Sequence, residues 1–336
     1  RLLQQGDLFL ACFGRNHDAR NYIDQAIISG CCAILVESGV DWQGIQLRDA
    51  VPIIAIDNLH AKISEISGRF FGHPSKKLNV IGITGTNGKT SCSQFLSQTL
   101  TALGYKCGVI GTLGYGISGE LQETQLTTPD AVFTQSALAR MHCEDIDPVA
   151  MEVSSVGLHQ KRVSSVLFDT AIFTNLTRDH LDYHETMEAY GENKKKLFMM
   201  PGLKTAIVNL DDSFALSIIN SVSSDVEILT YSLKNKIASV FAESLELTRN
   251  GFRAKICTPI GMGEITGKLI GYFNFSNVLA VLTALINYLP RHSGINIDSI
   301  CQKISELQPV DGRMEIIGES EEITVVVDYA HTPDGL

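Results

Sequence analysis

The stretch VIGITGTNGKT at residues 80–90 decides the fold of this chain. An apolar run from Val80 to Ile83 leads into a glycine-rich turn that ends in Lys89 and Thr90, and an apolar helical pattern follows. Strand, loop and helix in this order form a phosphate-binding loop, because loop N–H groups and the helix N-terminus face phosphate oxygens. Lys89 is then expected to reach the outer phosphates and Thr90 to hold Mg²⁺. Ile83 stands where the full motif has its first glycine, so a glycine turn followed by a chance Lys-Thr pair stays open as the alternative.

Composition and charge narrow the class of protein. At 336 residues the chain is longer than a domain with a single hydrophobic core usually is, so we expect two or three domains. Apolar residues make up 44% and charged residues 19%, which excludes an intrinsically disordered protein. The net charge of −10 is opposite to the basic balance usual for nucleic-acid binders, so a small-molecule substrate is favoured over nucleic acid.

Cysteine usage and hydropathy are typical of a cytoplasmic protein. The eight cysteines are scattered and none forms a C-x-x-C pair, which indicates reduced thiols rather than a zinc-finger framework. No run of 18 uninterrupted apolar residues and no signal peptide is evident in the sequence. We therefore expect neither membrane insertion nor export.

Strand-like and helix-like stretches alternate along the chain, which is typical of an α/β fold. Residues 1–73 predict a small α/β unit, and residues 78–308 predict a larger block. Strand candidates of the larger block lie at 149–153, 170–174 and 206–209. Because helices intervene, we expect a doubly wound, mostly parallel sheet. Residues 309–336 end just after an apolar strand candidate, so we expect only the beginning of a third domain there.

Polar side chains follow two of these strands, at the sheet edge where ligands bind in open parallel sheets. Glu152 lies at the end of the first strand and suits Mg²⁺, directly or through water; a solvated strand-end carboxylate is the alternative. His180 and His184 follow the second strand, four residues apart. They could form a metal-binding pair on one helical face, although no zinc signature is present. Either histidine could instead be a hydrogen-bonded structural residue.

A run of three lysines, 194–196, follows these histidines. Helical spacing separates them, because Lys194 falls on an apolar stripe while Lys195 and Lys196 point away. The stripe consists of Met187, Tyr190, Gly191, Leu197 and Phe198. A lysine on an apolar face is costly unless it finds a partner or loses its charge, and a neutral amine can take up CO₂ as a carbamate. The alternative is a buried aliphatic stem whose ammonium reaches the surface.

Taken together, the motifs resemble the Mur ligase family, most closely its MurE type, over the whole length of the chain. The segments that carry the resemblance are GTNGKT at 85–90, TTP at 127–129, MEVSS at 151–155, QKRV at 160–163, NLTRDHLD at 175–182 and DYAHTPD at 328–334. The TTP and DYAHTPD segments separate the MurE type from its sister ligases. The family's phosphate loop also lacks the first glycine, which accounts for Ile83.

The resemblance implies an N-terminal UDP-binding domain, a central ATPase and a C-terminal Rossmann-like domain, of which the last is truncated. It implies ATP-dependent, ADP-forming amide ligation in peptidoglycan precursor synthesis. The D-Glu carboxylate of UDP-MurNAc-L-Ala-D-Glu would take the γ-phosphoryl group of ATP. The amine of a diamino acid, expected to be meso-diaminopimelate, would then attack the acyl phosphate. The enzyme would act as a monomer in the bacterial cytoplasm.

The resemblance also assigns roles to individual residues. The catalytic set would be Lys89, Glu152, His180 and Lys194. One Mg²⁺ would be held by Thr90 and Glu152, and a second by His180 and the carbamate of Lys194. ATP would contact Gly85, Thr86, Asn87, Gly88, Lys89, Thr90, Ser91, Asn274, Arg313 and Asp328. The UDP-sugar dipeptide would contact Thr127, Thr128, Ser154, Gln160 and Arg162, with Arg15, Asn16 and His17 near its uracil or sugar.

Three other functions are alternatives to the ligase that the resemblance implies. Folylpolyglutamate synthases share the ATPase core and also join an amino acid to a carboxylate, but they lack a UDP-binding domain and the DYAHTPD segment. A non-catalytic nucleotide-binding fragment is a second alternative, because a truncated chain could bind ATP and UDP-sugar without completing ligation. A simple ATP or GTP hydrolase is disfavoured by the paired Mg²⁺-type residues and the substrate motif.

Overall fold

The computed structural model describes residues 3–14, 18–292, 296–317 and 325–332. It divides into two compact units, Arg1–Phe70 and Phe71–Leu336. The predicted end of the first domain at residue 73 lies close to this division. The second unit contains both the predicted central block and the described part of residues 309–336, so a separate third domain stays a prediction.

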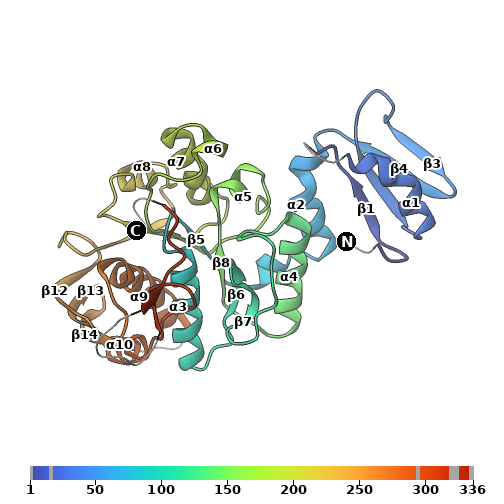
Figure 1. Cartoon of the computed structure of the whole chain (residues 1–336). Coiled ribbons are helices and arrows are strands. Elements are labelled where there is room, and N and C mark those ends of the chain that lie inside the picture. The colour runs from blue at the N-terminus through green and yellow to red at the C-terminus, as the bar shows by residue number, and fades with distance from the viewer. Residues whose placement is uncertain (1–2, 15–17, 293–295, 318–324, 333–336) are drawn as a thin grey trace. The chain divides into compact units, whose positions relative to one another are not determined.

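The first unit is a four-stranded sheet in the order β1-β2-β4-β3 (Figure 1). Its strands are β1 (Leu8–Ala11), β2 (Ala33–Glu37), β3 (Ile45–Arg48) and β4 (Val51–Ile56). Strands β1, β2 and β4 run parallel, and β3 pairs with β4 antiparallel. The helices are η1 (Ala19–Tyr22), α1 (Ile23–Ile28) and α2 (Leu59–Phe70). Buried side chains of the sheet and of α1 form one core, which confirms the predicted small α/β unit.

The second unit is built on a ten-stranded sheet in the order β14-β13-β12-β11-β10-β9-β5-β8-β6-β7. Its strands are β5 (Val80–Thr84), β6 (Gly108–Gly111), β7 (Gly114–Ile117), β8 (Val149–Glu152), β9 (Thr170–Phe173), β10 (Thr205–Asn209), β11 (Glu227–Ser232), β12 (Val240–Thr248), β13 (Gly251–Thr258) and β14 (Gly261–Gly267). From β12 to β6 all neighbours are parallel, and β7, β13 and β14 are antiparallel additions. The mostly parallel sheet is thus confirmed.

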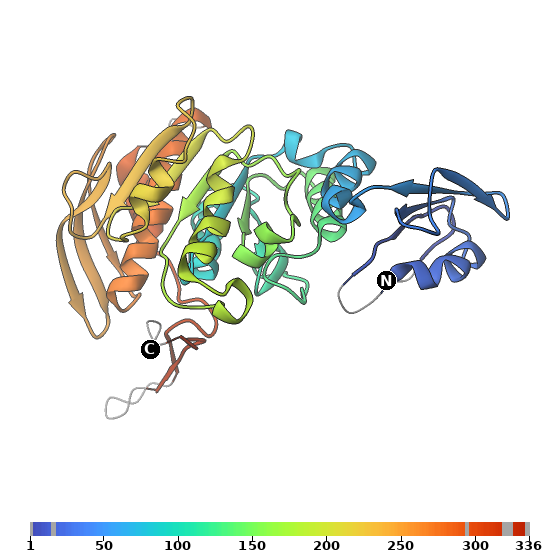
Figure 2. The same cartoon turned by 90° about the horizontal axis from the view of Figure 1, so that it is seen from above.

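Helices cover both faces of this sheet, so its central strands are buried on both sides (Figures 1 and 2). Alternate residues of one strand join different cores: Ile207 packs with α3, α9 and α10, while Ala206 and Val208 pack with the opposite layer. The helices are η2 (Pro74–Lys77), α3 (Lys89–Ala102), α4 (Ala131–Cys143), α5 (Ser155–His159), α6 (Leu181–His184), α7 (Met187–Lys195), η3 (Lys196–Met199), α8 (Ala215–Ile219), α9 (Tyr272–His292) and α10 (Ile297–Ser305). The doubly wound arrangement is therefore confirmed.

Helix α9 is the only helix among the described residues that is long and apolar enough to cross a membrane. Its most apolar window, Tyr272–Leu289, is 72% buried within the protein. The helix packs against α3 and against β10, β11 and β12 (Figure 2). Its hydropathy is accounted for by this central position in the core.

The last described residues form a two-stranded antiparallel sheet of β15 (Glu315–Ile317) and β16 (Val325–Val327). The predicted strand at 323–327 is present from Val325 onward, and its first two positions lie outside the described residues. Residues 328–332 follow β16 and belong to the site described next.

Candidate functional site

The phosphate loop joins β5 to α3, as the sequence predicts. Gly85 and Gly88 have φ values of +153° and +87°, which residues with a Cβ adopt only under strain. A Cβ at Gly88 would also overlap the side-chain oxygen of Asn277. The loop is held by the segment after β9, because Asn175 accepts hydrogen bonds from Thr86 N at its carbonyl and from Asn87 N at its side chain, both at 2.9 Å. Neighbouring strand ends thus fix the loop before any phosphate binds.

Lys89 lies folded over the loop that precedes it. Its Nζ donates hydrogen bonds to the carbonyl oxygens of Gly85 at 2.8 Å and Thr86 at 2.7 Å. Burial lowers its pKa, with a further lowering by Arg313, while Glu152 and the carboxylate of Asp179 act in the opposite direction. A phosphate in the loop would offer this ammonium a charged acceptor in place of neutral carbonyls.

Glu152 is fully buried at the end of β8. Its Oε2 accepts from Thr90 Oγ1 at 2.9 Å and from Thr112 Oγ1 at 3.1 Å, and its Oε1 accepts from Thr112 N at 2.9 Å. Burial raises the pKa of Glu152, and these hydrogen bonds and Lys89 counteract that shift. Backbone pairing sets its place: Glu152 lies opposite Ile83, whose carbonyl accepts from Val153 N at 2.8 Å.

Thr112 is a site residue that the sequence reasoning missed. It follows the short strand β6, next to β8 in the sheet, and its hydroxyl lies 3.0 Å from that of Thr127. Thr112 therefore links the buried carboxylate of Glu152 by hydrogen bonds to Thr127, a predicted substrate-binding residue. A signal existed in its position, directly after the strand-forming segment 108–111.

Lys194 is 1% exposed, so the burial predicted from helical spacing is present. Its Nζ donates to the carbonyl of Gly85 at 2.7 Å and lies 4.2 Å from the ring centre of Tyr190. Two lysines, Lys89 and Lys194, thus share one carbonyl oxygen. Burial lowers the pKa of Lys194 well below its ordinary value, and the nearby Lys89 lowers it further. The alternative of an ammonium that reaches the surface is wrong.

The two histidines differ in environment. His180 is partly exposed, and its Nε2 lies 3.4 Å from a carboxylate oxygen of Asp179. His184 is buried, with Nε2 2.9 Å from Ser155 Oγ and Nδ1 3.4 Å from Asn193 Nδ2. Burial lowers the pKa of His184 to about 4. With both ring nitrogens engaged by neutral partners, His184 fits the structural alternative, and only His180 remains a candidate metal ligand.

The segment after α10 returns to the phosphate loop. Arg313 Nη2 donates to Thr90 Oγ1 at 3.3 Å, and its guanidinium lies 4.6 Å from the ring centre of Tyr329. The carboxylate of Asp328 accepts from Met314 N at 2.7 Å and from Ala330 N at 2.6 Å, which fixes the turn that carries Tyr329. Arg313 and Asp328 thus line the same cavity as the phosphate loop, and their contact with ATP stays a prediction.

A cavity of about 420 Å³ collects most of the predicted residues. Predicted residues that line it are Thr86, Asn87, Gly88, Lys89, Thr90, Ser91, Thr127, Glu152, Ser154, His180, Asn274, Arg313 and Asp328. Lining residues that the sequence reasoning did not single out include Thr112, Asn175, Thr177, Asp179, Asn277, Tyr329 and His331. Asn175, Thr177, Asp179, Tyr329 and His331 lie within the NLTRDHLD and DYAHTPD segments, whereas Thr112 and Asn277 lie outside the motifs.

Five predicted residues of the described ranges lie outside that lining. Thr128 is fully buried and is bonded to the end of β8, since its hydroxyl donates to the carbonyl of Glu152 at 2.9 Å and accepts from Ser154 N at 2.8 Å. Gln160 and Arg162 form a hydrogen-bonded pair beside it. Lys194 lies behind the loop carbonyl of Gly85, itself absent from the lining. The predicted contacts Arg15, Asn16 and His17 lie outside the described residues.

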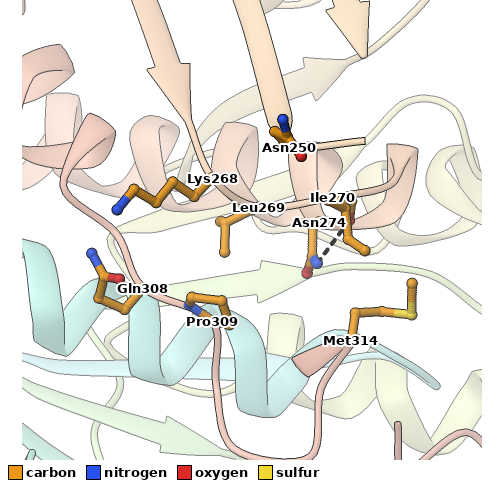
Figure 3. A pocket seen from close by; sticks show the side chains of 8 residues that line it. All are labelled: Asn250, Lys268, Leu269, Ile270, Asn274, Gln308, Pro309 and Met314. Carbon is orange, nitrogen blue, oxygen red and sulfur yellow. Dashed lines mark hydrogen bonds between the residues drawn. The ribbon is translucent and has the colours of Figure 1, made fainter. Parts of the chain in front are cut away.

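A second cavity of about 430 Å³ adjoins the start of α9 (Figure 3). Asn274 borders both cavities, and its Nδ2 donates to the carbonyl of Ile270 at 3.0 Å. Apolar side chains of Leu269, Pro309 and Met314 also line this cavity. Figure 3 shows the polar ends of Lys268 and Gln308 on the side away from Asn274.

No three His, Cys, Asp or Glu side chains within the described ranges cluster closely enough to bind a metal by themselves. A cation in the main cavity would therefore need hydroxyl, carbamate or ligand oxygens as well. Thr90 and Glu152 offer a hydroxyl and a carboxylate, which are the hard oxygen donors that Mg²⁺ prefers.

Comparison with known proteins decides the family. Residues 83–285 match the Mur ligase middle domain. The chain belongs to the Mur ligase family. A Coxiella burnetii Mur ligase, "UDP-N-acetylmuramoyl-L-alanyl-D-glutamate--2,6-diaminopimelate ligase", is 43% identical over 340 residues, covering all of this chain and 68% of that protein. The predicted family and enzyme class, an ATP-dependent amide ligase, are thereby confirmed.

Solved structures agree with this membership. A Mur ligase structure titled as a "UDP-N-acetylmuramoyl-L-alanyl-D-glutamate--2, 6-diaminopimelate ligase" matches with a TM-score of 0.84 and 31% identity, covering 99% of this chain and 66% of that one. A Mycobacterium tuberculosis folylpolyglutamate synthase matches with a TM-score of 0.66 and 17% identity, covering 82% of this chain and 68% of its own. At that identity the second likeness shows a shared fold alone.

Proposed function

We propose that this chain forms the greater part of an ATP-dependent ligase that joins meso-diaminopimelate to the D-Glu carboxylate of UDP-MurNAc-L-Ala-D-Glu, a step of peptidoglycan synthesis. The observation that carries the proposal is the single cavity in which a phosphate loop meets Glu152, Thr127 and Ser154. Such a cavity can bring a nucleoside triphosphate and a second anion together. The relatives that cover the whole chain supply the identity of that second anion.

ATP would bind with its phosphates on the loop N–H groups and on Lys89. Thr90 and Glu152 would hold Mg²⁺, which neutralises phosphate charge and keeps the γ-phosphorus open to attack. Arg313, which donates to the Thr90 hydroxyl, would contact the outer phosphates. The cavity beside Asn274 has apolar walls and a few polar groups, which suits the adenine ring (Figure 3).

The reaction would proceed in two steps. The D-Glu carboxylate attacks the γ-phosphorus, so that a C–O–P bond forms and ADP leaves. The amine of the diamino acid then attacks the acyl carbon and loses a proton, and the tetrahedral intermediate expels phosphate to leave an amide. Lys89 and Arg313 contribute positive charge where two anions must approach each other.

Lys194 and His180 would serve a second Mg²⁺. The low pKa of Lys194 favours the neutral amine, which adds to CO₂ to give a carbamate and release a proton. That change replaces a buried neutral amine by an anion beside the phosphate loop, and Lys89 would then have a counter-charge. His180 lies at the cavity wall with a ring nitrogen near Asp179.

The remaining parts of the proposal concern the first unit and the setting of the enzyme. Residues 1–73 would bind the uridine diphosphate end of the substrate, with Arg15, Asn16 and His17 near the uracil or sugar. Thr127, Thr128, Ser154, Gln160 and Arg162 would hold the muramoyl dipeptide. The enzyme would act as a monomer in the cytoplasm, without inserting into the membrane.

Phosphate release by the full-length protein tests the proposal. The protein is mixed with ATP, Mg²⁺ and UDP-MurNAc-L-Ala-D-Glu, and separate reactions receive meso-diaminopimelate, L-lysine or no amino acid. We expect release only when the nucleotide substrate and meso-diaminopimelate are both present. Parallel reactions with a folate and glutamate test the folylpolyglutamate alternative. Release that ignores the UDP-sugar would overturn the proposed ligase.

A further inference from the structure

The hydroxyl of Tyr183 starts a chain of hydrogen bonds that leads to the predicted substrate residues. Tyr183 lies on α6, and its hydroxyl is 2.9 Å from Nδ1 of His159 and 3.1 Å from Nε2 of Gln160. Oε1 of Gln160 in turn accepts from Nε of Arg162 at 3.0 Å and from Nη2 at 2.6 Å. The tyrosine is therefore linked to Arg162 by hydrogen bonds through the Gln160 amide.

This chain of bonds restrains a strained turn. Lys161, between the glutamine and the arginine, has a φ of +57°, a left-handed conformation that is unfavourable for a residue with a side chain. The turn lets Gln160 and Arg162 face each other despite their separation by one residue. A strained backbone persists where its surroundings hold it, and here the Tyr183 hydroxyl supplies an anchor from another helix.

Arg162 keeps its charge available for an anion. Its hydrogen bonds go to the amide oxygen of Gln160 and, from Nη1 at 2.7 Å, to the carbonyl of Thr128, which are neutral acceptors. Burial lowers the pKa of Arg162, and the nearby carboxylate of Asp130 acts in the opposite direction. The residue is partly buried, so an anionic ligand at its free face would meet a guanidinium that water screens only in part. The direction of the Arg162 guanidinium depends on the position of the Gln160 amide oxygen to which it donates.

The Tyr183 ring is itself held in place. It lies edge-on to the ring of His159, with centres 5.4 Å apart, and to that of His184, with centres 4.8 Å apart. His184 is fixed by its contact with Ser155 at the start of α5. Because these rings limit the tyrosine side chain to one position, its hydroxyl can define the orientation of the Gln160 amide.

We infer that Tyr183 is a positioning residue for the UDP-sugar dipeptide: its hydroxyl fixes the Gln160 amide, and through it Arg162, in the orientation that binds this anionic substrate. The inference rests on the proposed function. Without the hydroxyl the NH₂ group of Gln160 loses its acceptor, so the amide and the guanidinium bonded to its oxygen can move away from the observed orientation. Tyr183 would then affect binding of the UDP-sugar and leave ATP binding unchanged.

The test is Tyr183→Phe in the full-length protein, which keeps the ring and removes the hydroxyl. Binding of UDP-MurNAc-L-Ala-D-Glu is measured by calorimetry, and KM and kcat are measured by phosphate release. We expect Kd and KM for the UDP-sugar to rise ~10-fold, which corresponds to one lost hydrogen bond to a charged network. The KM for ATP should stay within ~2-fold. Tyr105→Phe, the same change beyond the far end of α3, should alter none of these values.

A double variant separates positioning from a general structural effect. If Tyr183 acts through Gln160, then Tyr183→Phe combined with Gln160→Ala should bind the UDP-sugar no more weakly than Gln160→Ala alone. If the double variant loses affinity for the UDP-sugar by the product of the two single losses, the inference is overturned. Unchanged binding in Tyr183→Phe would also overturn it. Neither result would contradict the proposed ligase function. A wild-type protein that fails to bind the UDP-sugar would overturn the proposed function and this inference together.

Discussion

Lys194 is the residue whose chemistry depends most on its surroundings. If its neutral amine becomes a carbamate, Lys194→Ala should lower ligase activity at least ~100-fold, because a buried negative charge beside the loop is lost. ATP affinity should change by less than ~3-fold, since Lys89 and the loop N–H groups remain. Acetate or formate should restore part of the activity by occupying the vacated space as a carboxylate.

The neighbouring Lys195 provides the control for this prediction. Its ammonium forms a surface ion pair with Glu192, so Lys195→Ala should leave ligase activity unchanged. Nuclear magnetic resonance with ¹³C-labelled CO₂ should detect a carbamate in the wild type and lose that signal in Lys194→Ala. Full ligase activity of Lys194→Ala without added carboxylate would contradict the assigned role.

His184 makes a prediction about acid stability. Its pKa in the folded protein is about 4, below the ordinary 6.5, so the unfolded state takes up a proton first as the pH falls. The stabilisation is fully present above pH 6.5 and is lost toward pH 4, at up to ~1.4 kcal/mol per pH unit. We expect the free energy of unfolding of the wild type to fall by ~2 kcal/mol more than that of His184→Gln between pH 7 and pH 5.

Denaturant titrations at the two pH values measure this difference. Glutamine can still donate to Ser155 and accept from Asn193 but cannot titrate, so it isolates the proton uptake from the loss of packing. Parallel decreases in the two proteins would show that His184 is not the group responsible.

At the scale of the element, the phosphate loop depends on glycine at position 88. Gly88→Ala should weaken ATP binding at least ~10-fold, because the new Cβ meets the Asn277 side chain and forces the loop to shift. Gly104→Ala is a matched control: Gly104 has a φ of +89° and no atom near the position of a Cβ. Both variants should lose ~1 kcal/mol of stability, but only Gly88→Ala should lose nucleotide affinity. Equal ATP affinity in the two, measured by calorimetry, would contradict this account.

The elements that the sequence predicted are those with a strong local signal. The run from Val80 to Thr90 combines an apolar strand, two glycines and a helix start, and helical spacing alone separated Lys194 from its two neighbours. Thr112 was missed because its strand is four residues long and glycine-rich, so no apolar alternation marks it. Asn277 was missed because its contact with Gly88 joins segments far apart in sequence, and only tertiary packing creates it.

At the scale of the whole molecule, the type of sheet could be predicted better than the full set of strands in it. Alternating strands and helices indicated a doubly wound sheet, and the sheet has that form from β12 to β6. The antiparallel strands β13 and β14 at one end and β7 at the other were not predicted, because edge strands carry weak apolar patterns. The site was predicted mainly through motifs, and the residues between motifs came only from the structure.

The isoleucine that replaces the first glycine of the loop motif has a mechanical consequence. Because Ile83 stays in the strand, it pairs with Glu152 through the sheet, and the main chain rather than side-chain rotamers sets the span between the loop and the carboxylate. The distance between the phosphate loop and Glu152 therefore stays constant throughout the reaction. As ATP becomes ADP and phosphate, the adjustment must therefore come from Lys89, from Arg313 and from residues 328–331, which also line the cavity.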